Sequence, residues 1–196
     1  MIYDEGLTHL HEVEVFKQPR LAIIPTGDEI VSGQDELTIG DIIESNSAMF
    51  KGMAHEAGAI AEVLPIVKDE RDSLFKAVQD AMADYDMVCM IAGSSAGRDD
   101  YTVNIAEELG EVYVHGISIK PGKPAILSKI DSKPFIGLPG FPVSGHIIFG
   151  EIIAPILRKR AHIPTPEQVT LRAKLTKNVV SSLKYQEYIR VKAGKM

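Results

Sequence analysis

The chain has 196 residues, of which 45% are apolar and 24% charged, values typical of a globular domain with a sizeable core. Its net charge of −6 argues against a general nucleic-acid binder, and no signal peptide or membrane-length apolar stretch occurs in the sequence. The single cysteine, Cys89, lies in an apolar run and is expected in the core, so an intrachain disulfide is excluded. We therefore expect a cytoplasmic protein that binds neither nucleic acid nor membranes.

Strand-like and helix-like segments alternate along most of the chain. Residues 11–20 alternate like a strand and then reach a proline, so we expect 1–18 to be a connector left from an upstream domain. Strand-like runs follow at 21–26, 61–67, 86–92, 111–119, 124–130 and 133–138. Helical stretches are expected at 45–58, 69–83 (behind a capping Asp69), 102–109 and 142–160. This alternation predicts an α/β fold of three layers, in which helices cover both faces of a mostly parallel sheet.

The C-terminal part has a different pattern. A Pro-rich hinge at 161–168 separates two further strand candidates, "VTLRAKLTK" and "YQEYIRVKAG", which have nothing beyond them to pair with. We expect an α/β domain at 19–163 and, at 164–196, the incomplete start of a β-barrel domain, so that the chain belongs to a longer architecture.

The first of four unusual loops follows the strand at 21–26. It reads "TGDEIVSG", and Gly27 allows a tight turn from which Asp28 and Glu29 project. We interpret Asp28 or Glu29 as a proton carrier or metal ligand, although a polar turn with an aspartate cap explains the same composition.

The second loop, "GSSAGRDD", follows the strand at 86–92. Its backbone N–H groups at 93–97 precede a helix, an arrangement that favours anions, although a glycine here also serves close packing. Asp100 is the expected functional acid, acting through a divalent metal, because hard cations take carboxylate oxygens. Arg98 and Asp99 can instead pair with each other at the surface.

The third and fourth loops carry cations and free backbone donors. In "SIKPGKPAI", Lys120 and Lys123 flank a Pro-Gly pair that bends and stiffens the loop, which predicts an oxyanion or phosphate partner unless the lysines are merely solvated. In "GLPGFPVSGH", Pro142 suits a first helical turn and leaves the N–H groups of Val143 and Ser144 for an anion. In a parallel sheet such loops gather at one edge, so we expect one shared site.

Several common chemistries are excluded by their missing motifs. The six histidines lack zinc-ligand spacing, and neither a phosphate-binding P-loop nor a G-x-G-x-x-G dinucleotide motif occurs. The G-x-S-x-G signature of hydrolases is also absent.

Taken in order, the four loops resemble those of the molybdopterin-binding domain of molybdopterin molybdotransferases, to which a domain of gephyrin-type proteins is related. The matching segments are "TGDEI" (26–30), "SN" (45–46), "KDERDSL" (68–74), "GSSAGRDDYT" (93–102), "KPGKP" (120–124) and "GLPGFPVS" (137–144). They cover roughly residues 20–160, and the last two favour the molybdotransferase branch over the wider superfamily.

The resemblance implies an enzyme that inserts molybdate into adenylylated molybdopterin and releases AMP, with Mg²⁺ as cofactor. Glu29, Asp69 and Asp100 match acidic positions and are expected to be catalytic, with Glu29 and Asp100 as Mg²⁺ ligands. Lys120 and Lys123 are expected to hold molybdate or phosphate oxygens. The substrate-binding residues that the resemblance implies are Thr26, Gly27, Asp28, Asn46, Gly93, Ser94, Ser95, Gly97, Lys120, Gly122, Lys123, Pro139, Gly140 and Ser144. The full-length protein is expected to form a homodimer.

Two departures from the family pattern keep other functions open. The second glycine of the usual Gly-Gly-Val-Ser-x-Gly loop is replaced by Ser94, and Phe141 stands where the family favours asparagine. The alternatives are a molybdopterin adenylyltransferase, against which "KPGKP" argues, and a non-catalytic module that binds molybdopterin or molybdate.

Overall fold

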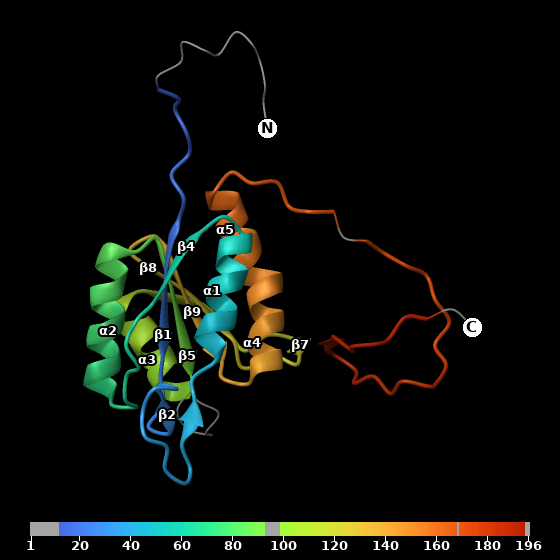
Figure 1. Ribbon diagram of the computed structural model, residues 1–196, viewed down its shortest axis with the longest axis horizontal. Coiled ribbons are helices and arrows are strands. Elements are labelled where there is room, and N and C mark those ends of the chain that lie inside the picture. Colours follow the sequence, from blue (N-terminus) through green and yellow to red (C-terminus); the bar gives the residue numbers. More distant parts are fainter. Residues whose placement is uncertain (1–11, 93–98, 168, 195–196) are drawn as a thin grey trace.

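The computed structural model describes residues 12–92, 99–167 and 169–194, and its elements form three layers (Figure 1). A six-stranded sheet lies in the middle, with strand order β4–β1–β5–β9–β8–β6. Its strands are β1 (Arg20–Pro25), β4 (Ile60–Val63), β5 (Met87–Ala92), β6 (Glu111–His115), β8 (Ile126–Ile130) and β9 (Lys133–Pro139). The three-layer α/β fold predicted from the sequence is confirmed.

Helices cover both faces of this sheet. On one face lie α2 (Arg71–Asp84) and α3 (Asp99–Leu109), and on the other α1 (Asn46–Glu56), α4 (Pro142–Ile148) and α5 (Ala154–Arg160) (Figure 1). A π-helical segment, η2 (Phe149–Ile153), joins α4 to α5, so the helix predicted at 142–160 is continuous. Pro155 in the first turn of α5 explains the π-helical turn of η2. Proline lacks an N–H, and its ring clashes with the carbonyl one turn before it.

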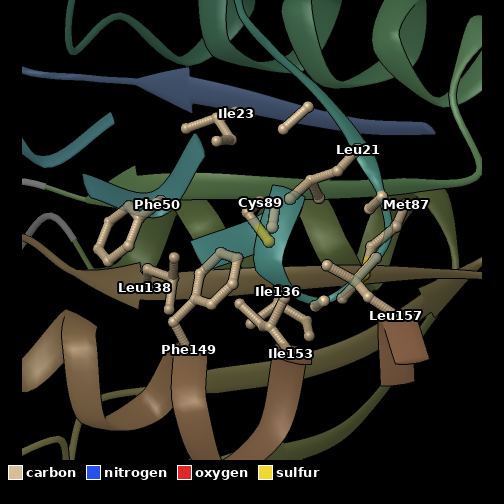
Figure 2. Packing of buried hydrophobic residues seen from close by; sticks show 14 of the residues in the cluster. Leu21, Ile23, Phe50, Met87, Cys89, Ile136, Leu138, Phe149, Ile153 and Leu157 are labelled. Carbon is tan, nitrogen blue, oxygen red and sulfur yellow. The ribbon is translucent and has the colours of Figure 1, made fainter. Parts of the chain in front are cut away.

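Strand side chains alternate between two hydrophobic cores. In β1, Leu21 and Ile23 belong to the core under α1, η2 and α5, whereas Ala22 and Ile24 belong to the core under α2 and α3. Figure 2 shows the first core, where Phe50 and Phe149 stack with ring centroids 5.4 Å apart. Cys89 is fully buried there, as predicted, and burial raises the pKa of its thiol.

One end of the sheet is antiparallel. The strands β4, β1, β5 and β9 pair in parallel, whereas β8 pairs antiparallel with both β9 and β6. Only Asp131 and Ser132 separate β8 from β9, and a two-residue connection permits antiparallel pairing alone. The parallel strands therefore bring their carboxyl ends, and the loops that follow them, to one edge.

Small two-stranded sheets flank this edge. The strands β2 (Ile30–Val31) and β3 (Ile42–Ile43) pair with each other within the connection between β1 and α1. The strand β10 (Gln186–Glu187) returns from the C-terminal part and pairs in parallel with β7 (Ile119–Lys120). The strand predicted at 169–177 is wrong, because those residues are exposed and form no strand. In the part of the chain that the structure describes, no helix is long and apolar enough to cross a bilayer.

Candidate functional site at the carboxyl edge of the sheet

A pocket of about 190 Å³ opens at the carboxyl ends of β1, β5 and β9. Its described lining combines four residues of the predicted site, Thr26, Glu29, Asn46 and Gly140, with residues that the predicted site did not include. The latter are Pro25, Ile30, Ile42, Ile43, Glu44, Ser45, Ile91, Phe141 and Pro142. The expectation that separate loops meet at one edge is therefore met for the first and the fourth loop.

Thr26 and Gly27 shape the floor of this pocket through the backbone. The Thr26 hydroxyl donates to the Ile91 carbonyl at 2.9 Å, which ties the end of β1 to β5. Gly27 has φ +146°, and a β-carbon there would lie 2.5 Å from Cγ1 of Ile30. Only glycine fits this turn without displacing a wall of the pocket.

Asp28 connects the first loop to the residues before α2. The backbone N–H of Asp69 donates to Oδ1 of Asp28 at 3.2 Å, so these two predicted acidic positions are neighbours. The capping role expected for Asp69 is wrong, because α2 begins at Arg71 and its N-cap position is held by Glu70.

Asn46 joins α1 to the fourth loop. Its side-chain N–H donates to the Gly140 carbonyl at 2.7 Å, across 94 positions of sequence. Ser45 occupies the N-cap position without a capping bond from its own side chain, and Oε1 of Glu44 instead accepts the Ser47 N–H at 2.9 Å. Because Glu44 caps the helix in place of Ser45, the Glu44 carboxylate lies at the edge of the pocket, which the sequence pattern did not indicate.

The lysine loop lies beside the pocket but does not line it in the described part of the chain. The Lys120 ammonium is 3.4 Å from the Ser182 hydroxyl and 5.8 Å from the centroid of the Tyr185 ring. Two hydrogen bonds from Ser182, and more weakly the charge of Lys120, lower the pKa of Glu187. The C-terminal segment around β10 therefore faces Lys120, although Lys120 and Lys123 are both exposed.

Gly122 packs this loop against α4. It is buried with φ +125°, and a β-carbon would lie 2.5 Å from Cδ1 of Ile148. The loop is therefore held next to the helix that begins at Pro142, where Ser144 is half-buried. Pro139 ends β9 and is buried, so its contribution to the site is to position Gly140.

Part of the predicted site lies outside the described residues. This applies to Gly93, Ser94, Ser95 and Gly97, and α3 contains Asp100 without a description of its side chain. Within the described ranges, no group of three or more His, Cys, Asp or Glu side chains lies close enough to hold a metal ion.

Phe141 is the functional candidate with the clearest earlier signal, because it departs from the asparagine expected at that position. It stands directly before α4, lines the pocket and leaves 63% of its surface exposed. Glu44 carried no comparable signal, since a glutamate ahead of a serine is common in the exposed loops of proteins.

Comparison with known proteins shows which family this chain resembles. Residues 22–159 match the model described as "Probable molybdopterin binding domain". A putative molybdopterin biosynthesis protein from Methanocaldococcus jannaschii is 34% identical over 178 residues, which cover 87% of this chain and 43% of that protein. A molybdopterin molybdenumtransferase from Bacillus subtilis is 31% identical over 179 residues, covering 91% of this chain and 42% of the relative.

A solved structure supports the same assignment. The molybdopterin biosynthesis MoeA protein from Pyrococcus horikoshii is 36% identical, with a TM-score of 0.68, over 74% of this chain and 36% of that one. The chain thus spans less than half the length of each of these relatives. With most of its α/β domain matched, the chain belongs to the family of probable molybdopterin-binding domains.

Proposed function

We propose that this domain serves molybdenum-cofactor biosynthesis by inserting molybdate into adenylylated molybdopterin with release of AMP. The observation that supports the proposal is the pocket where Thr26, Glu29, Asn46 and Gly140 meet at the carboxyl edge, next to the lysine loop. Relatives named molybdopterin molybdenumtransferase, about 30% identical, support the same step.

The residues around the pocket have different proposed roles, and the charge of each side chain decides which role it has. Lys120 and Lys123 would hold the oxygens of molybdate or of the pyrophosphate, since an ammonium on a stiff loop binds oxyanions without reorganising. Asn46 holds the Gly140 carbonyl and so keeps the fourth loop in place beside the ligand. Asp28 accepts a hydrogen bond from the Asp69 N–H, which keeps these two acidic residues next to each other.

Mg²⁺ is the proposed cofactor, with Glu29 and Asp100 as its protein ligands and Asp69 as a further acid nearby. Mg²⁺ usually takes one or two carboxylates and completes its shell with substrate phosphates and water, so a closed protein cage is not required. This edge of the sheet fits that coordination, because Glu29 lines the pocket and supplies a carboxylate. When bound, the ion would polarise the pyrophosphate of the substrate.

The test uses the purified chain with adenylylated molybdopterin, molybdate and Mg²⁺, and follows AMP release. We expect release that depends on molybdate, and a loss of tenfold or more in molybdate affinity in the double variant Lys120→Ala/Lys123→Ala, because charge-assisted hydrogen bonds are lost. The matched control is Lys51→Ala/Lys159→Ala, which removes two exposed lysines from α1 and α5.

Three outcomes would contradict parts of this proposal. Unchanged molybdate affinity in a folded Lys120/Lys123 double variant removes the oxyanion role. Tight binding without AMP release favours the non-catalytic module. AMP transfer from ATP to free molybdopterin favours the adenylyltransferase.

A further inference from the structure

Phe141 is a large aromatic side chain placed at the rim of a pocket. It is 63% exposed, and Ile42 and Ile43 of β3, which line the same pocket, are 53% and 47% exposed. Single exposed apolar residues are common on proteins, but an aromatic ring and two branched side chains around one hollow form a local apolar wall. Such a wall suits a ligand with a flat apolar face.

The position of Phe141 is fixed by its neighbours. Its carbonyl accepts the Gly145 N–H at 2.9 Å, and the preceding carbonyl, of Gly140, accepts the Asn46 side chain at 2.7 Å. Pro142 follows, and its ring restricts the backbone at the start of α4. These contacts hold the backbone that carries the ring, so the loop loses little freedom when a ligand binds.

Glu44 adds a polar edge to the same pocket. One of its oxygens, Oε1, accepts the Ser47 N–H at 2.9 Å, which anchors the carboxylate at the start of α1. A carboxylate offers about four acceptor sites, so this cap leaves acceptor capacity for a ligand. Two adjacent N–H donors on a flat ring are the natural complement of a carboxylate.

The size and the chemistry of the pocket suit a bicyclic ring whose polar edge carries two adjacent N–H donors. About 190 Å³ is below the 300–1,000 Å³ typical of sites for drug-sized ligands, so the pocket admits one bicyclic ring and leaves the rest of a larger substrate outside. The 2-amino-4-oxo edge of a pterin presents N–H groups side by side. Adenine instead presents a donor beside an acceptor and does not match a carboxylate.

We infer that this pocket receives the pterin ring of the substrate, with Phe141 stacked on the ring and Glu44 accepting its 2-amino and adjacent ring N–H groups. The inference rests on the proposed function, and it assigns two residues that determine which heterocycle enters. Stacking on Phe141 raises the affinity for a flat ring whatever groups the ring carries, whereas Glu44 favours a ring that presents two N–H donors to it.

The test titrates the purified chain with pterin (2-amino-4-oxopteridine), lumazine (2,4-dioxopteridine) and adenine by calorimetry. We expect the unaltered chain to bind pterin at least tenfold more tightly than lumazine or adenine, because a site built for N–H donors rejects a ligand that lacks one. Phe141→Ala should weaken pterin and lumazine alike, by about tenfold, through lost stacking, and Phe141→Trp should retain the affinity.

Glu44→Gln tests the edge without removing the helix cap, because the amide oxygen still accepts the Ser47 N–H. The amide NH₂ then faces the pocket and meets the 2-amino group of pterin donor to donor, whereas it matches the 2-oxo group of lumazine. We expect the preference to invert in favour of lumazine. Tyr113→Ala, which removes a 56% exposed aromatic ring from β6, is the matched control and should change neither affinity.

Equal affinity for pterin and lumazine in the unaltered chain would overturn the inference, as would unchanged affinities in folded Phe141→Ala and Glu44→Gln. Failure of pterin to bind the unaltered chain overturns it as well. None of these results affects the molybdate-dependent release of AMP, so the inference and the proposed function fail separately.

Discussion

At the scale of single residues, two positions expected to touch substrate also have structural duties. The Thr26 hydroxyl donates to the Ile91 carbonyl, and Gly122 packs directly on Ile148. A short ligand-binding motif can therefore contain residues that hold the loops in place rather than contact the ligand. Such positions are separated from true ligand contacts by measuring stability and binding in the same variant.

Gly122 and Gly52 make a matched pair for this purpose. Gly122→Ala should lower the free energy of unfolding by about 1–3 kcal/mol, because the new β-carbon clashes with Ile148 and the backbone has φ +125°. Gly52→Ala in α1 should raise it by about 0.5–1 kcal/mol, because nothing lies within 4 Å of the new β-carbon and alanine favours helix. Urea denaturation measures both, and equal effects in the two variants would contradict the packing role of Gly122.

At the scale of elements, a polar cluster ties β1 to β4 and to the end of α2. The Arg20 backbone N–H donates to the Asp86 carboxylate at 2.8 Å, and its guanidinium lies 4.6 Å from the centroid of the Tyr85 ring. The Tyr85 hydroxyl in turn donates to Oε2 of Glu62, in β4, at 2.5 Å. These contacts lie at the start of β1, opposite the pocket, and hold the edge strand β4 on the sheet.

This cluster predicts a loss of stability at alkaline pH. Burial first, and then the hydrogen bond to Glu62, raises the pKa of Tyr85 above its ordinary value near 10. The folded state thus holds the phenolic proton more tightly than the unfolded state. The contribution of the Tyr85 proton to the free energy of unfolding is complete below pH 10. This free energy falls as the pH rises from 10 through the higher folded-state pKa of Tyr85.

The measurement is denaturant unfolding at pH values from 8 to beyond 10, on the unaltered chain and on Tyr85→Phe. We expect the unaltered chain to lose more stability above pH 10 than the phenylalanine variant, which has no proton to release. Parallel curves for the two proteins would show that Tyr85 does not titrate differently on folding.

At the scale of the whole molecule, the α/β domain contains its own core. In the described part of the chain, no buried apolar residue follows Leu157, and the C-terminal segment touches the domain through β10 and its neighbours. We propose that residues 164–196 belong to a further β domain, as the sequence pattern predicts. The stability of the protein therefore depends on the α/β domain, whereas the C-terminal segment affects the geometry of the site at Lys120.

Removal of residues 164–196 should therefore leave a folded domain. We expect a cooperative thermal transition, monitored by far-ultraviolet circular dichroism, with a midpoint within a few degrees of the intact chain, since both cores remain complete. A non-cooperative transition in the shortened chain would refute the self-sufficiency of the domain. A folded shortened chain with an altered affinity for molybdate would locate the effect at Lys120.

The sequence alone was enough for the architecture because the central strands β1, β5 and β9 carry nearly continuous apolar runs and the helices between strands carry periodic ones. Leu21 to Ile24 are buried on alternate faces, a pattern typical of a sheet covered on both sides. The loops could also be recognised, since glycine, proline and paired charges after strands are local signals. The helix cap at Glu70, by contrast, could not be distinguished from one at the neighbouring Asp69 without the backbone angles of both residues.

Only the tertiary structure decided which of these loops share a pocket. Asn46 meets Gly140 across 94 positions, and Lys120 faces Ser182 across 62, contacts that no local pattern encodes. Strand order determines such neighbours, and it follows from how apolar faces pack over the whole sheet. The sequence by itself therefore determined the fold class and the chemistry available at its edge, while packing decided that Phe141 and Glu44 stand at the pocket and the lysines beside it.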